Sequence, residues 1–176
     1  MIAKNHPDII ELDAASHTGV DTIRAVIDNA YVLPVLKEKK FYIIDEVHML
    51  SKNAFNALLK LIEEPPPHVI FIFATTEVQK IPLTVLSRCQ RYDLRRLSIE
   101  EILTLLRNIA QNENLKFEEE ALKIIALKAE GSARDATGLL DQASSYIHNV
   151  DQNDIITAES VNRMLGLVQV STILKL

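Results

Sequence analysis

The first half of the chain has the hydrophobic pattern of a sheet covered by helices. Continuous apolar runs at residues 41–44 and 69–74 are typical of strands buried on both faces, and residues 8–13 predict a shorter strand before them. Apolar residues at helical spacing predict helices over residues 21–31 and 51–62. Because strands alternate with helices, the pattern favours a parallel α/β sheet.

The second half of the chain changes to helical spacing. A short helix is predicted over residues 83–87 and a last strand over residues 91–94, and after residue 97 the pattern is helical throughout. Ser98 and Ser132 each stand three positions before an acidic residue, as in a capping box, and Thr157 can cap a further helix. Four helices are therefore predicted, over residues 98–111, 118–130, 132–148 and 157–166.

The composition narrows the class of protein. A chain of 176 residues allows one domain or two small ones, and 48% apolar residues suffice for a core. The formal charge of −5 argues against a broadly basic nucleic-acid surface, although it allows a local patch. Cys89 is the single cysteine, which excludes an intrachain disulfide and a four-cysteine zinc site and fits a cytoplasmic setting. No apolar run is long enough to predict a transmembrane helix, and the first residues do not form a signal peptide.

Two adjacent carboxylates, Asp45 and Glu46, follow the apolar run at residues 41–44. Acidic side chains at the carboxyl end of a parallel strand lie in the crevice where open α/β sheets bind ligands. Asp45 is suited to hold a hydrated Mg²⁺, which prefers oxygen ligands, and Glu46 is suited to orient or deprotonate an attacking water. This is the Walker B arrangement of a P-loop NTPase. The alternative interpretation is a strand end with two solvated acids.

Three further polar residues are candidates for the same chemistry. Thr76 ends the second apolar run and could hydrogen-bond a γ-phosphate or the attacking water; a threonine satisfied by nearby backbone is the alternative. Arg88 follows a short helix and could stabilise transition-state charge in a neighbouring subunit, worth about 10³–10⁵ in rate in the best cases. A surface ion pair is the alternative for Arg88. Arg134 stands in the first turn of a predicted helix, where the helix dipole disfavours a cation, so a functional role is favoured.

Four motifs, in order along the chain, resemble those of AAA+ clamp-loader ATPases. Residues 45–51 are similar to the Walker B strand end and its loop, and residues 74–77 are similar to sensor 1. Residues 86–89 match the Ser-Arg-Cys motif of clamp loaders, and residues 131–136 are similar to sensor 2. The resemblance extends over about residues 7–166 of the chain.

This resemblance implies a function in DNA replication. In the family, a ring of subunits binds ATP and Mg²⁺, opens the sliding clamp and places it on primer–template DNA in the cytoplasm, as part of a DNA-directed DNA polymerase. Asp45 would hold Mg²⁺, Glu46 would activate water and Thr76 would sense the γ-phosphate. Arg134 would report the nucleotide to the lid, and Arg88 would act in trans.

The resemblance also implies an organisation into domains. The expected fold is α/β, an incomplete AAA+ parallel sheet followed by a small all-α lid. A partial nucleotide-binding domain is expected over residues 1–96, the lid over residues 97–166, and the start of a truncated next domain over residues 167–176.

The chain departs from the family in one respect that matters for chemistry. It has only four glycines and no G-x-x-x-x-G-K-[ST] sequence, so the phosphate-binding loop and the strand before it are missing, as is the family's zinc module. We therefore expect a middle fragment with no tight triphosphate binding, negligible ATP hydrolysis by itself and an exposed edge at residues 69–74.

Two other functions are alternatives to an ATPase subunit. The missing loop favours a non-catalytic ring member like the delta-prime stator, which only donates an arginine, but the intact pair Asp45 and Glu46 argues against it. The Ser-Arg-Cys motif argues against a Holliday-junction branch-migration motor.

Residues close to the motifs receive structural roles or remain candidates. Cys89 is interpreted as a packing residue and His48 as part of the loop structure. Candidates for contacts with the DNA backbone are Lys52, Asn53 and Lys80. Such contacts do not read the base sequence.

Overall fold

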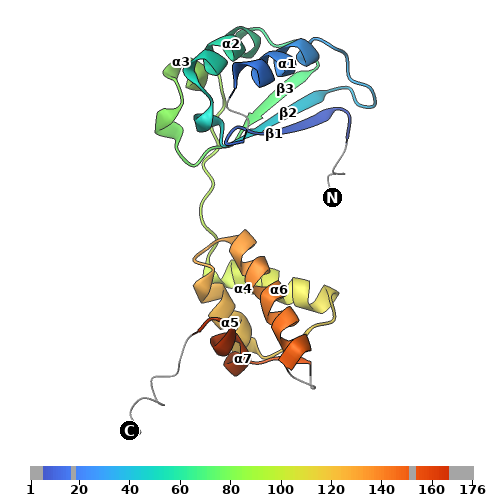
Figure 1. Cartoon of the computed structure of the whole chain (residues 1–176), viewed down its shortest axis with the longest axis vertical. Helices are drawn as coiled ribbons and strands as arrows, with labels where there is room; N and C mark the ends of the chain where they lie inside the picture. Colours follow the sequence, from blue (N-terminus) through green and yellow to red (C-terminus); the bar gives the residue numbers. More distant parts are fainter. Residues whose placement is uncertain (1–5, 17–18, 151–153, 167–176) are drawn as a thin grey trace. The chain divides into compact units, whose positions relative to one another are not determined.

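The computed structural model of the chain describes residues 6–16, 19–150 and 154–166 (Figure 1). The chain forms two compact units that divide between Tyr92 and Asp93. The further domain expected at residues 167–176 lies outside the described residues. Each unit has its own core and is described by itself.

The first unit contains the predicted parallel sheet. Its strands are β1 (Ile9–Asp13), β2 (Lys40–Asp45) and β3 (Val69–Phe73), and they pair in parallel in the order β1-β2-β3. The helices are α1 (Val20–Ala30), α2 (Lys52–Glu63) and α3 (Leu83–Leu86), with short 3₁₀ turns η1 (Val47–Met49) and η2 (Val78–Lys80). All three helices lie over the same face of the sheet in Figure 1. The helices predicted from the spacing of apolar residues are thus confirmed.

The two faces of the sheet differ in burial. Tyr42 and Ile44 of β2 are buried under the helices, and Phe71 of β3 stacks on Tyr42. On the opposite face, Ile70 and Ile72 remain 37% and 46% exposed. The expectation that β3 is buried on both faces is therefore wrong, because the described helices of this unit cover only one face.

β3 is an edge strand of the described sheet, as expected. The last strand predicted at residues 91–94 is wrong: within the described chain these residues belong to no helix or strand, and Leu94 is 95% exposed. A strand needs a neighbouring strand to supply its backbone hydrogen bonds. Residues 91–94 instead lead from the first unit into the second.

The second unit is a small helical domain. It contains α4 (Ile99–Asn112), α5 (Glu119–Lys128), α6 (Ala133–Val150) and α7 (Ala158–Met164), which matches the four predicted helices. Its core consists of apolar side chains from these helices, among them Ile102, Leu106, Leu122, Ile125 and Leu140. The prediction of purely helical structure is corrected by two short parallel strands, β4 (Lys116–Phe117) and β5 (Ile155–Ile156). Strands of two residues are too short to produce a period in the sequence.

The predicted helix caps are present. Ser98 Oγ accepts a hydrogen bond from the Glu101 backbone at 3.2 Å, and Glu101 Oε2 accepts one from the Ser98 backbone at 2.8 Å. Arg95 donates two further bonds to the same carboxylate, and these bonds contribute most to lowering the pKa of Glu101 to about 2. Thr157 caps α7 in the same reciprocal way.

Gly131 joins the start of the second unit to the turn that precedes α6. Its carbonyl oxygen accepts from the Leu97 backbone at 3.0 Å, and Arg96 Nη1 donates to the Glu130 carbonyl at 2.6 Å. Gly131 has φ +85°, and a Cβ atom there would lie 2.7 Å from Arg96 Cβ. Only glycine meets both the conformation and the close approach.

Asp8 holds a loop that the sequence did not single out. Its buried carboxylate accepts the backbone N–H groups of Val35, Leu36 and Lys37 at 2.6, 2.7 and 2.8 Å. Burial alone would raise the pKa of Asp8, but the three backbone hydrogen bonds together lower it below the ordinary value. The loop thereby keeps a fixed shape although its apolar side chains are exposed (Tyr31, Val32, Leu33, Val35, Leu36).

The substitution Asp8→Asn should lower the urea midpoint of unfolding at neutral pH. The amide keeps one carbonyl oxygen but turns its NH₂ group toward N–H donors, so hydrogen bonds to the loop are lost. Because the pKa of Asp8 is lower in the folded chain, its carboxylate stabilises the fold above the ordinary Asp pKa. This stabilisation is lost as the pH falls through the folded-state pKa.

Urea unfolding over that pH range checks the prediction. The difference between the midpoints of the two chains should shrink toward acid pH, where Asp8 is neutral in both states. Asp28→Asn, at an exposed position of α1, is the matched control and should leave the midpoint unchanged. A difference that does not vary with pH would contradict the role assigned to the charge.

The substitution Gly131→Ala should destabilise the second unit by about 1–3 kcal/mol, from the strain of a positive φ and the overlap with Arg96. Gly138→Ala is the matched control, since Gly138 lies within α6 with no atom within 4 Å of an added Cβ. Gly138→Ala should raise the free energy of unfolding by about 1 kcal/mol, which is the difference in helix propensity between alanine and glycine. Thermal unfolding followed by circular dichroism measures both effects, and equal shifts would contradict the assignment.

Candidate functional site

The ends of β2 and β3 bring the candidate residues to one rim of the sheet. Beyond the paired strands, the Ala74 backbone N–H donates to the Ile44 carbonyl at 2.9 Å, and the Val47 N–H donates to the Ala74 carbonyl at 3.0 Å. Thr76 Oγ1 then donates to Glu46 Oε2 at 3.4 Å. The prediction that the acid pair and the threonine share one rim is confirmed.

Glu46 has a left-handed backbone, with φ 47° and ψ 41°. This conformation costs a residue with a side chain about 1–2 kcal/mol, and such strain is concentrated at functional sites. The Asp45 carboxylate supports the turn, because Asp45 Oδ1 accepts from the Glu46 backbone N–H at 2.9 Å. The turn allows the chain to pass from β2 directly into η1 while both carboxylates stay at the rim.

Asp45 is exposed at this rim and lies opposite Asp13 of β1 in the sheet register. The sequence analysis missed Asp13, which its place at the end of β1 could have revealed. Its carboxylate accepts from the Ala15 backbone and the Ser16 hydroxyl, both at 2.8 Å, and so supports the loop after β1.

The donor atoms at the rim fit one kind of metal ion. Among the described residues, no group of three His, Cys, Asp or Glu side chains is placed to hold an ion by itself. Mg²⁺ is commonly bound through one or two carboxylates, with water and substrate phosphates as the other ligands. The single carboxylate of Asp45 fits that arrangement and does not fit an all-protein site.

His48 has closer contacts with the site than the sequence analysis assigned to it. Its side chain is only 7% exposed, with Nδ1 2.9 Å from Thr75 Oγ1 and 3.3 Å from Glu46 Oε2. Its Nε2 is 3.4 Å from Glu77 Oε1, which also accepts from Lys80 at 2.7 Å. The Lys80 hydrogen bond is the main cause that lowers the pKa of Glu77. His48 thus lies between the carboxylates of Glu46 and Glu77.

Arg88 is held within its own chain. Its Nη1 donates to the Thr84 carbonyl at 2.7 Å and to Ser87 Oγ at 3.2 Å, and its Nη2 lies 2.8 Å from Glu63 Oε1 at the end of α2. This is the ion pair considered as the alternative for Arg88. Both side chains are substantially exposed, and exposed ion pairs are weak, so the guanidinium can exchange partners.

Arg134 belongs to the second unit and is described apart from the rim of the first. It is exposed in the first turn of α6, and its side chain has no hydrogen bond or ion pair within the described chain. Ser132 Oγ accepts from the Asp135 backbone at 3.2 Å, which confirms the predicted cap. The role of Arg134 toward a nucleotide stays a prediction.

The remaining candidates near the motifs have simple environments. Cys89 packs partly buried against the core of the first unit, and burial raises the pKa of its thiol, so the packing interpretation is confirmed. Lys52 and Asn53 are exposed in the first turn of α2, and Lys80 pairs with Glu77. Contact with DNA stays a prediction for these three.

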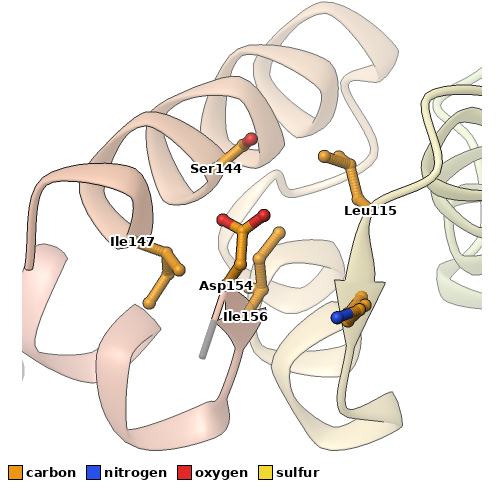
Figure 2. A pocket seen from close by; sticks show the side chains of 6 residues that line it. Leu115, Ser144, Ile147, Asp154 and Ile156 are labelled. Atoms are coloured by element: carbon orange, nitrogen blue, oxygen red, sulfur yellow. The ribbon is translucent and has the colours of Figure 1, made fainter. Parts of the chain in front are cut away.

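A small hollow occurs in the second unit (Figure 2). It is lined by Leu115, Lys116, Ser144, Ile147, Asp154 and Ile156. Its volume of about 10 Å³ is room for about one water molecule and none for a nucleotide. Within the described residues, no helix has the length and apolarity needed to cross a membrane.

Two protein-family models match the sequence. One, described as DNA polymerase III, delta subunit, matches residues 1–98, which is more than half of the chain. The other, described as DNA polymerase III clamp loader subunit, ATPase lid domain, matches residues 101–148 and so falls on the helical unit.

Curated relatives are similar along nearly the whole chain. DNA polymerase III subunit tau of Bacillus subtilis (strain 168) is 51% identical over 161 residues, covering 92% of this chain and 28% of the relative. Subunit gamma of Buchnera aphidicola subsp. Schizaphis graminum is 49% identical over 160 residues, covering 91% and 43%. Subunit tau of Escherichia coli K12 is 46% identical over 159 residues, covering 90% and 24%. The chain thus spans less than half the length of these relatives.

Solved structures share the fold. The RuvB Holliday junction branch migration motor of Thermotoga maritima superposes with a TM-score of 0.75 at 20% identity, covering 92% of this chain and 53% of that one. A DNA polymerase III gamma subunit-related protein from the same organism gives 0.54 at 21% identity, covering 93% and 57%. At these identities the likeness is one of fold, and it confirms the expected α/β fold of a parallel sheet followed in the chain by a small helical domain.

The fold does not separate a branch-migration motor from a clamp loader, but the sequence does. Both halves of the chain match models of DNA polymerase III subunits, and the tau and gamma relatives are similar over 92% and 91% of the chain. The expected resemblance is confirmed, and the chain belongs to the family of DNA polymerase III clamp-loader subunits.

Proposed function

We propose that this chain is the central part of an ATPase subunit of the replicative clamp loader, of the gamma/tau type. In that role it would act in the cytoplasm within a ring of subunits that uses ATP and Mg²⁺ to load the sliding clamp on primer–template DNA. The observation that carries the proposal is the shared rim, where Thr76 Oγ1 contacts Glu46 Oε2 beside Asp45. A strand-end acid pair with a hydroxyl beside it can serve a terminal phosphate, a metal ion and a water together.

Each rim residue has a chemical task in this proposal. Asp45 contributes one carboxylate ligand to Mg²⁺, which neutralises charge on the transferred phosphate when it is bound. Glu46 orients the attacking water and accepts its proton. Thr76 is near enough to Glu46 to respond to the same phosphate. Arg134 links the nucleotide to the lid.

A non-catalytic ring member that only donates Arg88 is the second candidate. The Ser-Arg-Cys motif at residues 86–89 is the feature that such a subunit would keep to serve its neighbour. The strained turn at Glu46 and its contact with Thr76 support the ATPase instead, because a subunit that only donates an arginine does not need them. Since these 176 residues contain no G-x-x-x-x-G-K-[ST] sequence to hold a triphosphate, we expect this polypeptide by itself to hydrolyse ATP negligibly.

A chimera tests the proposal. Residues 7–166 would replace the matching segment of the Bacillus subtilis tau subunit, to which this chain is 51% identical over 161 residues. With the other subunits, clamp and primed DNA present, the chimera should hydrolyse ATP. Glu46→Gln should lower kcat by about 10²–10³ with little change in KM, because the amide cannot accept a proton. Asp45→Asn should also raise the Mg²⁺ requirement.

The matched control is Glu11→Gln, an exposed carboxylate on β1 away from the rim, which should leave kcat unchanged. A chimera that folds and assembles but has no clamp-dependent ATPase would overturn the ATPase proposal in favour of the second candidate.

Arg88 gives a prediction for the trans role. Arg88→Ala in the chimera should lower ring ATPase by about 10³-fold if the guanidinium serves a neighbour's γ-phosphate. Glu63→Ala removes the same ion pair but keeps the arginine, so it should leave ATPase within about threefold of the unsubstituted ring, since exposed pairs contribute little. Steady-state rates measure both. Equal losses from the two substitutions would show that only the intrachain pair matters.

A further inference from the structure

His48 is a nearly buried histidine at the rim to which the proposed function gives no task. Three polar side chains from two loops surround its ring: Glu46, Thr75 and Glu77. A buried imidazole needs polar partners, and these three side chains lie 2.9–3.4 Å from its ring nitrogens. These contacts differ in what they contribute to the rim of the sheet.

His48 lies close to the Glu46 carboxylate oxygen that also accepts a hydrogen bond from Thr76. Glu46 Oε2 lies 3.3 Å from His48 Nδ1 and 3.4 Å from Thr76 Oγ1. Both described contacts of the Glu46 carboxylate involve Oε2, so Oε1 remains for a water molecule. His48 Nδ1 is thus within reach of this oxygen as a second donor, beside the single long bond from Thr76.

The contact with Glu77 is already supported by other groups. Glu77 Oε1 accepts from Lys80 at 2.7 Å, and the Glu77 backbone N–H donates to Thr75 Oγ1 at 3.0 Å. A neutral imidazole has a single N–H, which can serve the Glu46 side through Nδ1 or the Glu77 side through Nε2. A proton on Nδ1 points toward Thr75 Oγ1 and toward the Glu46 carboxylate, whose other printed donor is the Thr76 hydroxyl at 3.4 Å, whereas Glu77 Oε1 already accepts from Lys80 at 2.7 Å.

We propose that His48 is a positioning residue for Glu46. Its Nδ1–H, directed at Thr75 Oγ1 and Glu46 Oε2, holds the carboxylate in place and ties it to the loop at residues 75–77. The inference rests on the proposed function, because it gives Glu46 its role toward water. In that role, loss of His48 affects the rate of the chemical step and leaves nucleotide binding unchanged.

Nuclear magnetic resonance of this chain tests the contact without any activity. Nitrogen-15 shifts of the His48 ring should show Nδ1 protonated, and Glu46→Gln should change the Nδ1 shift more than the Nε2 shift. Glu77→Gln is the matched control and should act mainly on Nε2. A ring protonated at Nε2 alone, with a bare Nδ1, would overturn the inference, because His48 would then donate nothing to Glu46.

Two substitutions in the ATPase chimera test the consequence. The amide nitrogen of Asn reaches the position of Nδ1, whereas that of Gln reaches the position of Nε2. His48→Asn should therefore keep kcat within about threefold, and His48→Gln should lower kcat by about 10- to 100-fold, the usual effect of a misplaced catalytic group. KM for ATP should stay unchanged in both variants.

The outcomes distinguish a failure of the positioning role of His48 from a failure of the proposed ATPase function. Equal kcat losses in the Asn and Gln variants, or a loss that appears in KM, would overturn the positioning role. An inactive unsubstituted chimera would overturn the proposed function instead, while the ring shifts of His48 would still decide whether it holds Glu46.

Discussion

The site depends on backbone hydrogen bonds that continue past the ends of the paired strands. The bonds from Ala74 to Ile44 and from Val47 to Ala74 tie the exit of β3 to the exit of β2, and a bond from Ala14 to Asp45 adds the exit of β1. These backbone bonds bring together side chains that are about thirty positions apart in the sequence, so the side chains do not have to pack against one another to come close. The strained backbone of Glu46 persists because these bonds hold the residues on either side of it.

Much of this arrangement follows from the sequence. The apolar run before Asp45 and the one before Thr76 predict parallel strands, and parallel strands end at a common rim. The caps at Ser98 and Thr157 could be predicted because they are local, set by a hydroxyl and a polar side chain three positions apart. Local sequence patterns therefore predict the helices and strands, and the parallel order of the strands predicts that the main site residues lie close together.

Other features depend on groups that are distant in the sequence or on what covers a surface. An apolar strand does not reveal whether helices cover one face or both, so the exposure of Ile70 and Ile72 could not be predicted. The contact of His48 with Glu46 depends on a loop conformation, and that of Asp8 with Val35 joins residues 27 positions apart. In each case the sequence shows the residue type but not its partner.

The attachment of Arg96 and Leu97 to the turn at Gly131 restricts where the chain can bend. Since the Glu130 and Gly131 carbonyls and the Glu101 carboxylate hold residues 95–97, this stretch moves as one body with the helical unit. Residues 90–94, which come before this stretch, lie in no helix or strand. The turn before α6, which leads directly to Arg134, is therefore fastened to the first residues of the helical unit by the backbone as well as by its core.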